Sequence, residues 1–298
     1  MKKILITGAD GRIGGTLVRR LLDETEFSVV GVSFTREMFD GMLDRMEIRD
    51  RSRTAFLSHE EFLSPDTPLD DLYAAVHLAF SRRNCPAADI ASSIDFASAV
   101  FGRLAVSGAE RVINLSSQGV YGKTEEFRTE DTPPAPETQY TMAKYAAEVI
   151  FNTQFGSGRV PDYANLRLDP VVQSQNLVIA LCKQAKEGRI SLRGGEQRFS
   201  FIDVEDAASA LTAMLLSPAG WAHTYNVGWN RMRFTLTEVA DHVAAVSERL
   251  GFGRPEITLE KQDIVLWAGL DSTRFSAHTG WKPEIGFDQM IERIFGTL

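Results

Sequence analysis

The sequence TGADGRIG at residues 7–14 directly follows the apolar run Ile4-Leu5-Ile6, which lies in a strand expected at residues 2–7. This order predicts a buried strand, a glycine-rich turn and an amphipathic helix that extends to about Leu22. The backbone N–H groups and the helix dipole at such a turn attract an anion, and the missing side chains let a pyrophosphate approach closely. The stretch therefore predicts the first βα unit of a dinucleotide-binding sheet, although the same glycines could simply mark a turn.

The next apolar run, at residues 27–34, predicts the second strand. NAD-binding domains usually place Asp or Glu at the end of this strand, against the ribose 2′-hydroxyl. Here Ser33 holds that position and Arg36 follows it, so no carboxylate repels a 2′-phosphate and a guanidinium can pair with one. Arg12, inside the glycine turn, is a second candidate for this role. We expect NADP or NAD as cofactor, with NADP slightly favoured; the alternative is that Arg36 is only a solvated loop residue.

Three later apolar runs, at residues 74–81, 111–117 and 163–168, predict further buried strands of a parallel sheet. A helix is expected at residues 88–106, whereas residues 36–72 are polar and indicate only a poorly defined strand near 54–57. Ligands of open parallel sheets bind at the carboxyl ends of the strands. The polar residues at those ends are Ser81, Ser116, Ser117 and Asp169. His77 lies inside an apolar run and is expected to be a buried core histidine.

Tyr140 and Lys144 lie four residues apart in a helix that begins at Thr138 or Gln139, and so share one face. A phenol with a pKa near 10 is a poor base at neutral pH, but a neighbouring ammonium favours the phenolate. Tyr140 could then act as an acid/base while the Ser117 hydroxyl holds the substrate oxygen. The spacing alone is weak evidence, because a half-buried Tyr beside a solvated Lys would give the same pattern.

Beyond residue 169 the alternation of strands and helices weakens, which indicates a smaller lobe. We predict a dinucleotide-binding domain at residues 1–168. Residues 169–298 would be mainly a substrate-binding lobe, interleaved with the last elements of the first domain. The expected fold class is α/β: a Rossmann-type doubly wound parallel sheet with a smaller C-terminal α+β lobe.

Composition limits the partners. The net charge of −8 over 298 residues argues against nucleic acid, because binding to phosphate backbones normally needs a basic face. No apolar run reaches 18 residues, and the first one is too short for a signal peptide, so no membrane partner is expected. Cys85 and Cys182 are the only cysteines and have no metal-ligand spacing, so neither a disulfide nor a metal is expected. These features predict a cytoplasmic protein.

Taken in order, the motifs resemble those of the extended short-chain dehydrogenase/reductase superfamily, in particular its NAD-dependent epimerase/dehydratase group, which acts on nucleotide sugars. The match covers nearly the whole chain. Its segments are TGxxGxxG at 7–14, HLA at 77–79, SSxxVYG at 116–122, YxxxK at 140–144, LRL before Pro170, RFSFIDVEDAA at 198–208, YNVG at 225–228 and GWKP at 280–283.

The resemblance implies roles for individual positions. Tyr140 is similar to the catalytic acid/base, Lys144 to the lysine that lowers its pKa and contacts the nicotinamide ribose, and Ser117 to the residue that orients the substrate. The implied cofactor contacts are Gly8, Gly11, Arg12, Ile13, Leu78, Ala79, Ser81, Ser116 and Pro170, with Tyr140 and Lys144. The implied substrate contacts are Ser81, Ser117, Gln118, Asp169 and Arg198, the last of which would hold a diphosphate.

Four departures from the family pattern limit what it implies. The acidic residue after the second strand is absent, and Ser93 replaces a frequent Asn. Gln118 stands where 4,6-dehydratases place an acid pair, which disfavours dehydration. A second phosphate-binding arginine before Leu270 is not evident, and Lys261 is a possible substitute.

The expected function is therefore an NAD(P)-dependent epimerase that acts on a nucleotide sugar through transient hydride transfer. The alternative is a reductase or dehydrogenase of a sugar or small carbonyl compound, and less favoured is a non-catalytic NAD(P)-sensing regulator. The resemblance also implies a homodimer formed through the helices around residues 90–106 and 139–152.

Overall fold

A computed structural model of the protein describes residues 2–69, 71–156, 158–174 and 176–298. Seven parallel strands form its central sheet, in the order β3-β2-β1-β4-β5-β6-β9. Their bounds are β1 Lys3–Thr7, β2 Ser28–Ser33, β3 Thr54–Ser58, β4 Leu72–His77, β5 Arg111–Ser117, β6 Asp162–Leu168 and β9 Thr224–Val227. Strand order reverses between β1 and β4, which is where ligands of such sheets bind. The predicted doubly wound α/β fold is confirmed.

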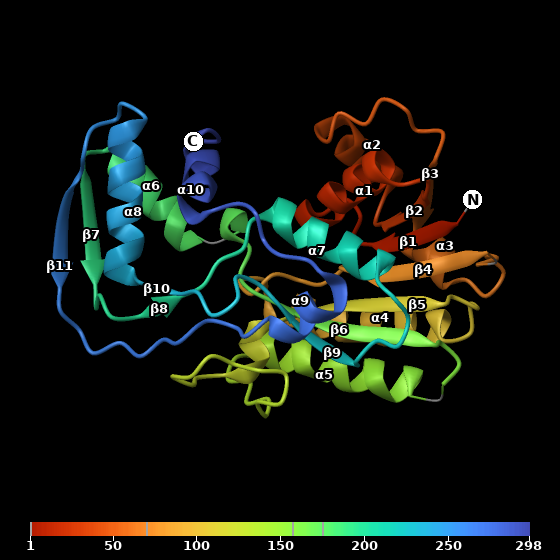
Figure 1. Ribbon diagram of the computed structural model, residues 1–298. Coiled ribbons are helices and arrows are strands. Elements are labelled where there is room, and N and C mark those ends of the chain that lie inside the picture. The colour runs from red at the N-terminus through yellow and green to blue at the C-terminus, as the bar shows by residue number, and fades with distance from the viewer. Residues whose placement is uncertain (1, 70, 157, 175) are drawn as a thin grey trace.

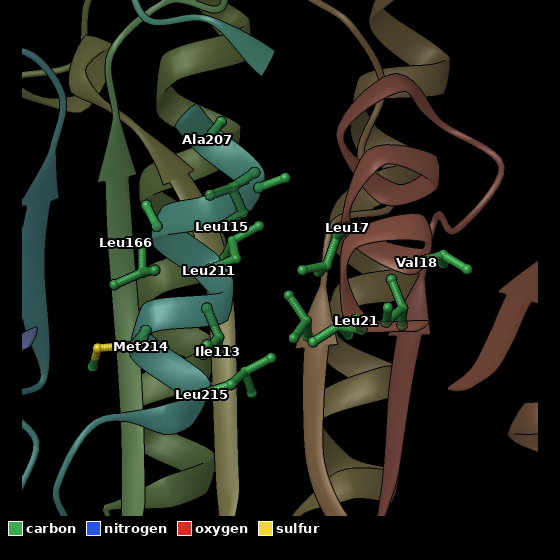
Figure 2. Close-up of a cluster of buried hydrophobic side chains, with 14 of the residues drawn as sticks. Leu17, Val18, Leu21, Ile113, Leu115, Leu166, Ala207, Leu211, Met214 and Leu215 are labelled. Atoms are coloured by element: carbon green, nitrogen blue, oxygen red, sulfur yellow. The ribbon is translucent and has the colours of Figure 1, made fainter. Parts of the chain in front are cut away.

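Helices cover both faces of this sheet (Figure 1). One face carries α1 (Arg12–Glu24), α2 (Arg36–Arg45) and α7 (Val204–Leu216), and the other carries α4 (Ala87–Leu104) and α5 (Gln139–Phe155). Figure 2 shows leucines of α7 lying over apolar side chains of β5 and β6, with the leucines of α1 beside them in the same apolar layer. Burial of apolar surface on both faces explains why the strands are continuous apolar runs rather than alternating ones.

Residues 36–72 contain more regular structure than the sequence indicated. They include α2, β3 and the short helix α3 (His59–Leu63), which begins with a capping box between Ser58 and Glu61. The elements are five to ten residues long and their polar faces are exposed, so the apolar periodicity is weak. Strand β4 also ends at His77, earlier than the predicted residue 81. Residues 78–81 therefore form a loop that leaves the carboxyl edge of the sheet.

The C-terminal lobe has its own apolar core. It consists of α6 (Asn176–Lys186), α8 (Leu236–Arg249) and α10 (Phe287–Phe295), with two small sheets. These sheets pair β7 (Arg189–Arg193) with β11 (Glu256–Glu260), and β8 (Arg198–Phe199) with β10 (Phe234–Thr235). Between these segments the chain returns to the main sheet through α7 and β9, and α9 (Thr273–Thr279) packs near β9 (Figure 1).

Within the part of the chain that the structure describes, no helix is long and apolar enough to cross a membrane. The same residues contain no cluster of three or more His, Cys, Asp or Glu side chains that could hold a metal ion. Both cysteines are free thiols, and burial raises the pKa of Cys182 to about 12.

Candidate active site

The glycine turn follows β1 and packs closely on Leu78 and Ala79, which follow the end of β4. Gly8 has φ +69°, and a Cβ there would lie 2.9 Å from both the Cα and the backbone N of Ala79. A Cβ on Gly14 would lie 2.2 Å from the carbonyl oxygen of Gly8. Only glycine fits these two positions, so no side chain covers the backbone of the turn beside the start of α1. The N–H groups of Gly8 and Gly11 donate to the carbonyls of Val32 and Gly8.

His77 is a buried residue that holds the strand residue before the glycine turn. Its Nδ1 lies 2.8 Å from the Thr7 hydroxyl, whose oxygen also accepts hydrogen bonds from the backbone N–H groups of Leu78 and Ala79. Burial lowers the pKa of His77 to about 3, so the imidazole is neutral at physiological pH. The prediction of a buried core histidine is confirmed.

Two of the nearby arginines contact or belong to the glycine turn, and a third follows β2. Arg12 is exposed at the start of α1, and the Arg36 guanidinium lies 4.8 Å from the ring centroid of Phe56. Arg45, which the sequence analysis missed, donates a hydrogen bond of 3.1 Å to the carbonyl of Asp10. Ser33 is fully buried, and its hydroxyl has no hydrogen-bond partner among the described residues. An uncovered glycine turn with cations nearby fits the phosphates of a dinucleotide.

Tyr140 and Lys144 lie in the first two turns of α5, which begins after the N-cap Thr138. The Lys144 Nζ is buried, donates a 2.8 Å hydrogen bond to the carbonyl of Leu115 and lies 4.0 Å from the ring centroid of Phe80. The Tyr140 ring meets the same Phe80 ring edge-on, with 6.1 Å between centroids. Phe80 thus brings the pair together at the carboxyl ends of β4 and β5.

The sequence predicted that Lys144 would lower the pKa of Tyr140, but in the structure the pKa of Tyr140 is raised. Burial raises the pKa of Tyr140 to about 12, although Arg83 acts in the opposite direction. Burial also lowers the pKa of Lys144 to about 7, against the opposing charge of Glu148. Without a cofactor, therefore, Tyr140 is held as the neutral phenol and Lys144 is only partly charged at neutral pH. A further positive charge beside the phenol would favour its ionised form.

The two serines at the end of β5 have different surroundings. Ser117 is partly exposed, and its oxygen accepts a 3.1 Å hydrogen bond from the backbone N–H of Gly119. Ser116 is buried, with no hydrogen-bond partner for its hydroxyl in the described chain. A Cβ on Gly119 would lie 2.6 Å from the Thr141 methyl group. The turn after Ser117 therefore packs directly on the helix that carries Tyr140.

Gln118 and Asp169 lie in a buried network rather than on an open surface. The Gln118 amide donates to Ser200 (3.0 Å), and the Ser200 hydroxyl donates to Asp169 (2.7 Å). The Gln118 oxygen accepts from Arg128 (3.3 Å) and from the backbone of Gly269 (3.0 Å). Burial raises the pKa of Asp169 to about 7. Through Ser200 and Gly269, these two side chains connect the ends of β5 and β6 to later segments of the chain.

Of the remaining predicted residues, Ser81, Ser93 and Pro170 follow or flank strands of the main sheet, and Arg198 lies in the C-terminal lobe. The Ser93 hydroxyl donates to Ser81 Oγ (2.9 Å), which anchors the loop after β4 to α4. Pro170 follows β6, and its carbonyl accepts from the backbone of Ile202 (3.0 Å). Arg198 lies in β8 of the lobe, with its guanidinium 5.3 Å from the ring of Trp267. Sequence reasoning missed Arg128, Arg233 and Trp267, which come from loops without a recognisable pattern.

The doubly wound sheet and the glycine turn define a dinucleotide-binding α/β protein with polar side chains at the carboxyl ends of its strands. Residues 4–228 match the family described as "NAD dependent epimerase/dehydratase family". The chain belongs to this family, and the resemblance to the extended short-chain dehydrogenase/reductase type is confirmed.

The sequence is 26% identical to a dTDP-glucose 4,6-dehydratase of Escherichia coli, over 98% of this chain and 91% of that protein. It is 27% identical to a UDP-glucose 4-epimerase of Mycolicibacterium smegmatis, over 98% of this chain and 96% of that protein. The fold is similar to that of a UDP-glucuronic acid 4-epimerase variant from Bacillus cereus, crystallised with a fluorinated UDP-glucuronic acid and NAD. That similarity has a TM-score of 0.83 at 19% identity, over 99% of this chain and 98% of the other.

Proposed function

We propose that this protein is an NAD(P)-dependent epimerase that acts on a nucleotide sugar. The observation that carries the proposal is that Ser117 ends β5, while Tyr140 and Lys144 contact Phe80, the residue after the Ala79 that packs on Gly8. Relatives named for the dTDP-glucose and UDP-glucose reactions, and a structural neighbour crystallised with a UDP-sugar and NAD, support the same substrate class.

In this proposal the residues move one proton and hold the sugar. Ser117 accepts or donates a hydrogen bond at the reacting hydroxyl, and Tyr140 takes its proton as the carbinol becomes a ketone and returns it afterwards. Lys144 contributes positive charge near the phenolate. The nicotinamide, when bound, supplies the hydride chemistry and a further positive charge. If the bound ketone rotates and presents its other face before the hydride returns, the configuration at that carbon inverts.

The residues after Ser117 argue for epimerisation over dehydration. Elimination of water needs an acid and a base near the leaving hydroxyl, in addition to Tyr140. Here the next two positions are Gln118 and Gly119, neither of which titrates. The hydrogen-bonding atoms of Gln118 are also engaged by Ser200, Arg128 and Gly269.

The deciding experiment incubates the purified protein with UDP-, GDP- and dTDP-sugars and catalytic NAD or NADP. NMR follows the sugar configuration while absorbance follows the cofactor. Inversion without net cofactor reduction is the expected result. Cofactor turnover that matches product would instead make the protein a reductase or dehydrogenase. Stoichiometric cofactor binding with no turnover of any sugar would favour the regulatory alternative.

Arg36→Ala is expected to weaken NADP more than NAD, because we propose that this guanidinium, three residues after the end of β2, pairs with the ribose 2′-phosphate. A charge-assisted hydrogen bond contributes roughly 1.5–3 kcal/mol, so the loss for NADP should be about tenfold or more. Titration of the two cofactors by intrinsic fluorescence measures it. Equal losses for NADP and NAD would show that the preference for NADP was mistaken.

The proposed homodimer would form through α4 and α5, which lie side by side on one face of the sheet (Figure 1). Met142 and Val149, seven residues apart on α5, are 52% and 48% exposed. Val149→Glu should therefore convert a dimer into monomers, because it replaces an exposed apolar side chain of the proposed interface with a charged one. Light scattering during size-exclusion chromatography measures the mass. A monomeric wild-type protein would end the dimer proposal.

A further inference from the structure

The loop after β4 carries two arginines close to Tyr140 and Lys144. Phe80 in this loop contacts both of these side chains, and Arg82 and Arg83 follow it two and three residues later. Three residues of extended chain span at most about 10 Å. Both arginines therefore lie on the same edge of the sheet as the residues proposed to react.

Hydrogen bonds fix the backbone of this loop. The Ser81 hydroxyl donates to the carbonyl of Asp89 in α4 (2.9 Å). The backbone N–H of Cys85 donates to the carbonyl of Arg82 (3.0 Å), which closes a four-residue turn with Arg83 at its second position. The guanidinium of Arg83 is thus presented from a tight turn that is anchored to α4.

The charge of Arg83 is unpaired and acts on the phenol. Both arginines are exposed, and neither forms an ion pair or hydrogen bond with the residues that the structure describes. Burial raises the pKa of Tyr140, and the positive charge of Arg83 acts against this rise. The chain as a whole has a net charge of −8, so this turn is a local cation in an acidic protein. An anionic group of a ligand is the partner that such a cation lacks.

The expected places of the phosphates indicate which anion this is. The pyrophosphate of the cofactor is expected at the glycine turn after β1, and the diphosphate of the substrate at Arg198 in the lobe. Tyr140, in contrast, marks the reacting carbon of the sugar. A cation beside that carbon can pair with a charged substituent of the sugar ring itself. A carboxylate suits it, because its two oxygens match the paired donors of a guanidinium.

We propose that Arg83 pairs with a carboxylate on the sugar, so that the preferred substrates are nucleotide-linked uronates rather than neutral sugars. The inference rests on the proposed function, which it narrows from nucleotide sugars to acidic ones. Arg83, which sequence reasoning did not single out, would then determine specificity without taking part in the proton transfer.

The test compares wild type, Arg83→Met and Arg82→Met on matched pairs of sugars. Each pair carries the nucleotide that the substrate panel identifies; for UDP, the pairs are UDP-glucuronate with UDP-glucose and UDP-galacturonate with UDP-galactose. Methionine keeps an unbranched apolar side chain while it removes the charge and the donors. An effect of the lost charge on Tyr140 changes both sugars of a pair alike, so the ratio of their kcat/KM values isolates the carboxylate contact.

We expect the wild type to prefer the uronate at least tenfold in kcat/KM, as one charge-assisted contact allows. Arg83→Met should lower this ratio at least tenfold, through a higher KM for the uronate. Arg82→Met, the matched control, should keep the ratio within twofold of wild type. Arg83→Lys keeps the charge but loses the paired donors, so an intermediate ratio is expected.

An unchanged ratio in Arg83→Met would overturn the assignment, whether that variant loses activity on both sugars alike or loses only affinity for the cofactor. An equal fall of the ratio in Arg82→Met would also overturn it. If neutral nucleotide sugars react and uronates do not, the proposed function stands and this inference fails.

If no nucleotide sugar reacts, the proposed function fails and a binding measurement decides the role of Arg83. The cofactor-loaded protein is then titrated calorimetrically with free glucuronate and with glucose. Tighter binding of glucuronate by the wild type, lost in Arg83→Met, supports the carboxylate contact. Equal binding of the two sugars, or no binding of either, refutes it.

Discussion

Tyr140→Phe is expected to lower kcat by about 10²–10⁴-fold, because it removes the group that transfers the proton and leaves the ring in place. The ring packs on Phe80, and its hydroxyl makes no hydrogen bond among the described residues, so the fold should not change. Cofactor affinity should stay close to that of the wild type. Steady-state kinetics on the sugar identified by the substrate panel, with cofactor titration, measures both quantities.

Tyr145→Phe is the matched control. Tyr145 lies on the same helix but packs against Val120, Tyr121 and Leu270, away from Phe80. The same atom is removed from the same residue type, so any general effect on α5 should appear in both variants. Equal turnover in the two variants would refute the assignment of Tyr140. A loss of cofactor binding in Tyr140→Phe alone would give Tyr140 a binding role instead.

The sequence predicted the part of the site that is local in the chain. The glycine turn, Ser117, and the pair Tyr140 and Lys144 each lie within a few residues of a strand end or helix start, where periodicity and spacing carry information. The rest depends on contacts between distant segments. Trp267, Arg198 and Arg233 meet only because the lobe folds back on itself, and nothing in their immediate sequence distinguishes them from other loop residues.

The same distinction holds for the fold. The long apolar runs that form β1, β2, β5 and β6 were found with small errors at their ends, since both faces of the sheet are buried. The pairing of β7 with β11 was not predicted. Their outward faces are exposed, and their partners are far apart in the chain, so no local signal relates them.

Protonation was the least predictable feature of the site. The spacing of Tyr140 and Lys144 predicted a lowered pKa for the phenol, but the spacing contains no information on burial. In the structure Phe80 covers both side chains, and loss of water opposes the charged form of each. In the proposed mechanism, the positive charge of a bound cofactor would favour the phenolate of Tyr140. Cofactor binding and acid/base function would then be coupled.

Arg167→Met is expected to destabilise the protein by about 3–5 kcal/mol, because it leaves the Glu148 carboxylate buried without its partner. Arg167 and Glu148 are 5% and 1% exposed. The guanidinium binds the carboxylate through both Nε and Nη2, at 2.6–3.2 Å, and lies 4.6 Å from the ring centroid of Tyr121. Urea unfolding of wild type and variant measures the difference.

The double variant Arg167→Met/Glu148→Leu tests the reason for this loss. Both charges are then absent and apolar side chains fill the space, so most of the stability should return. Arg254→Met, which breaks the exposed pair with Glu248, should change stability little. If the double variant is as unstable as Arg167→Met, the cost comes from lost packing against Tyr121 rather than from an unpaired charge. The pair would then stabilise α5, and with it Tyr140 and Lys144, through shape rather than electrostatics.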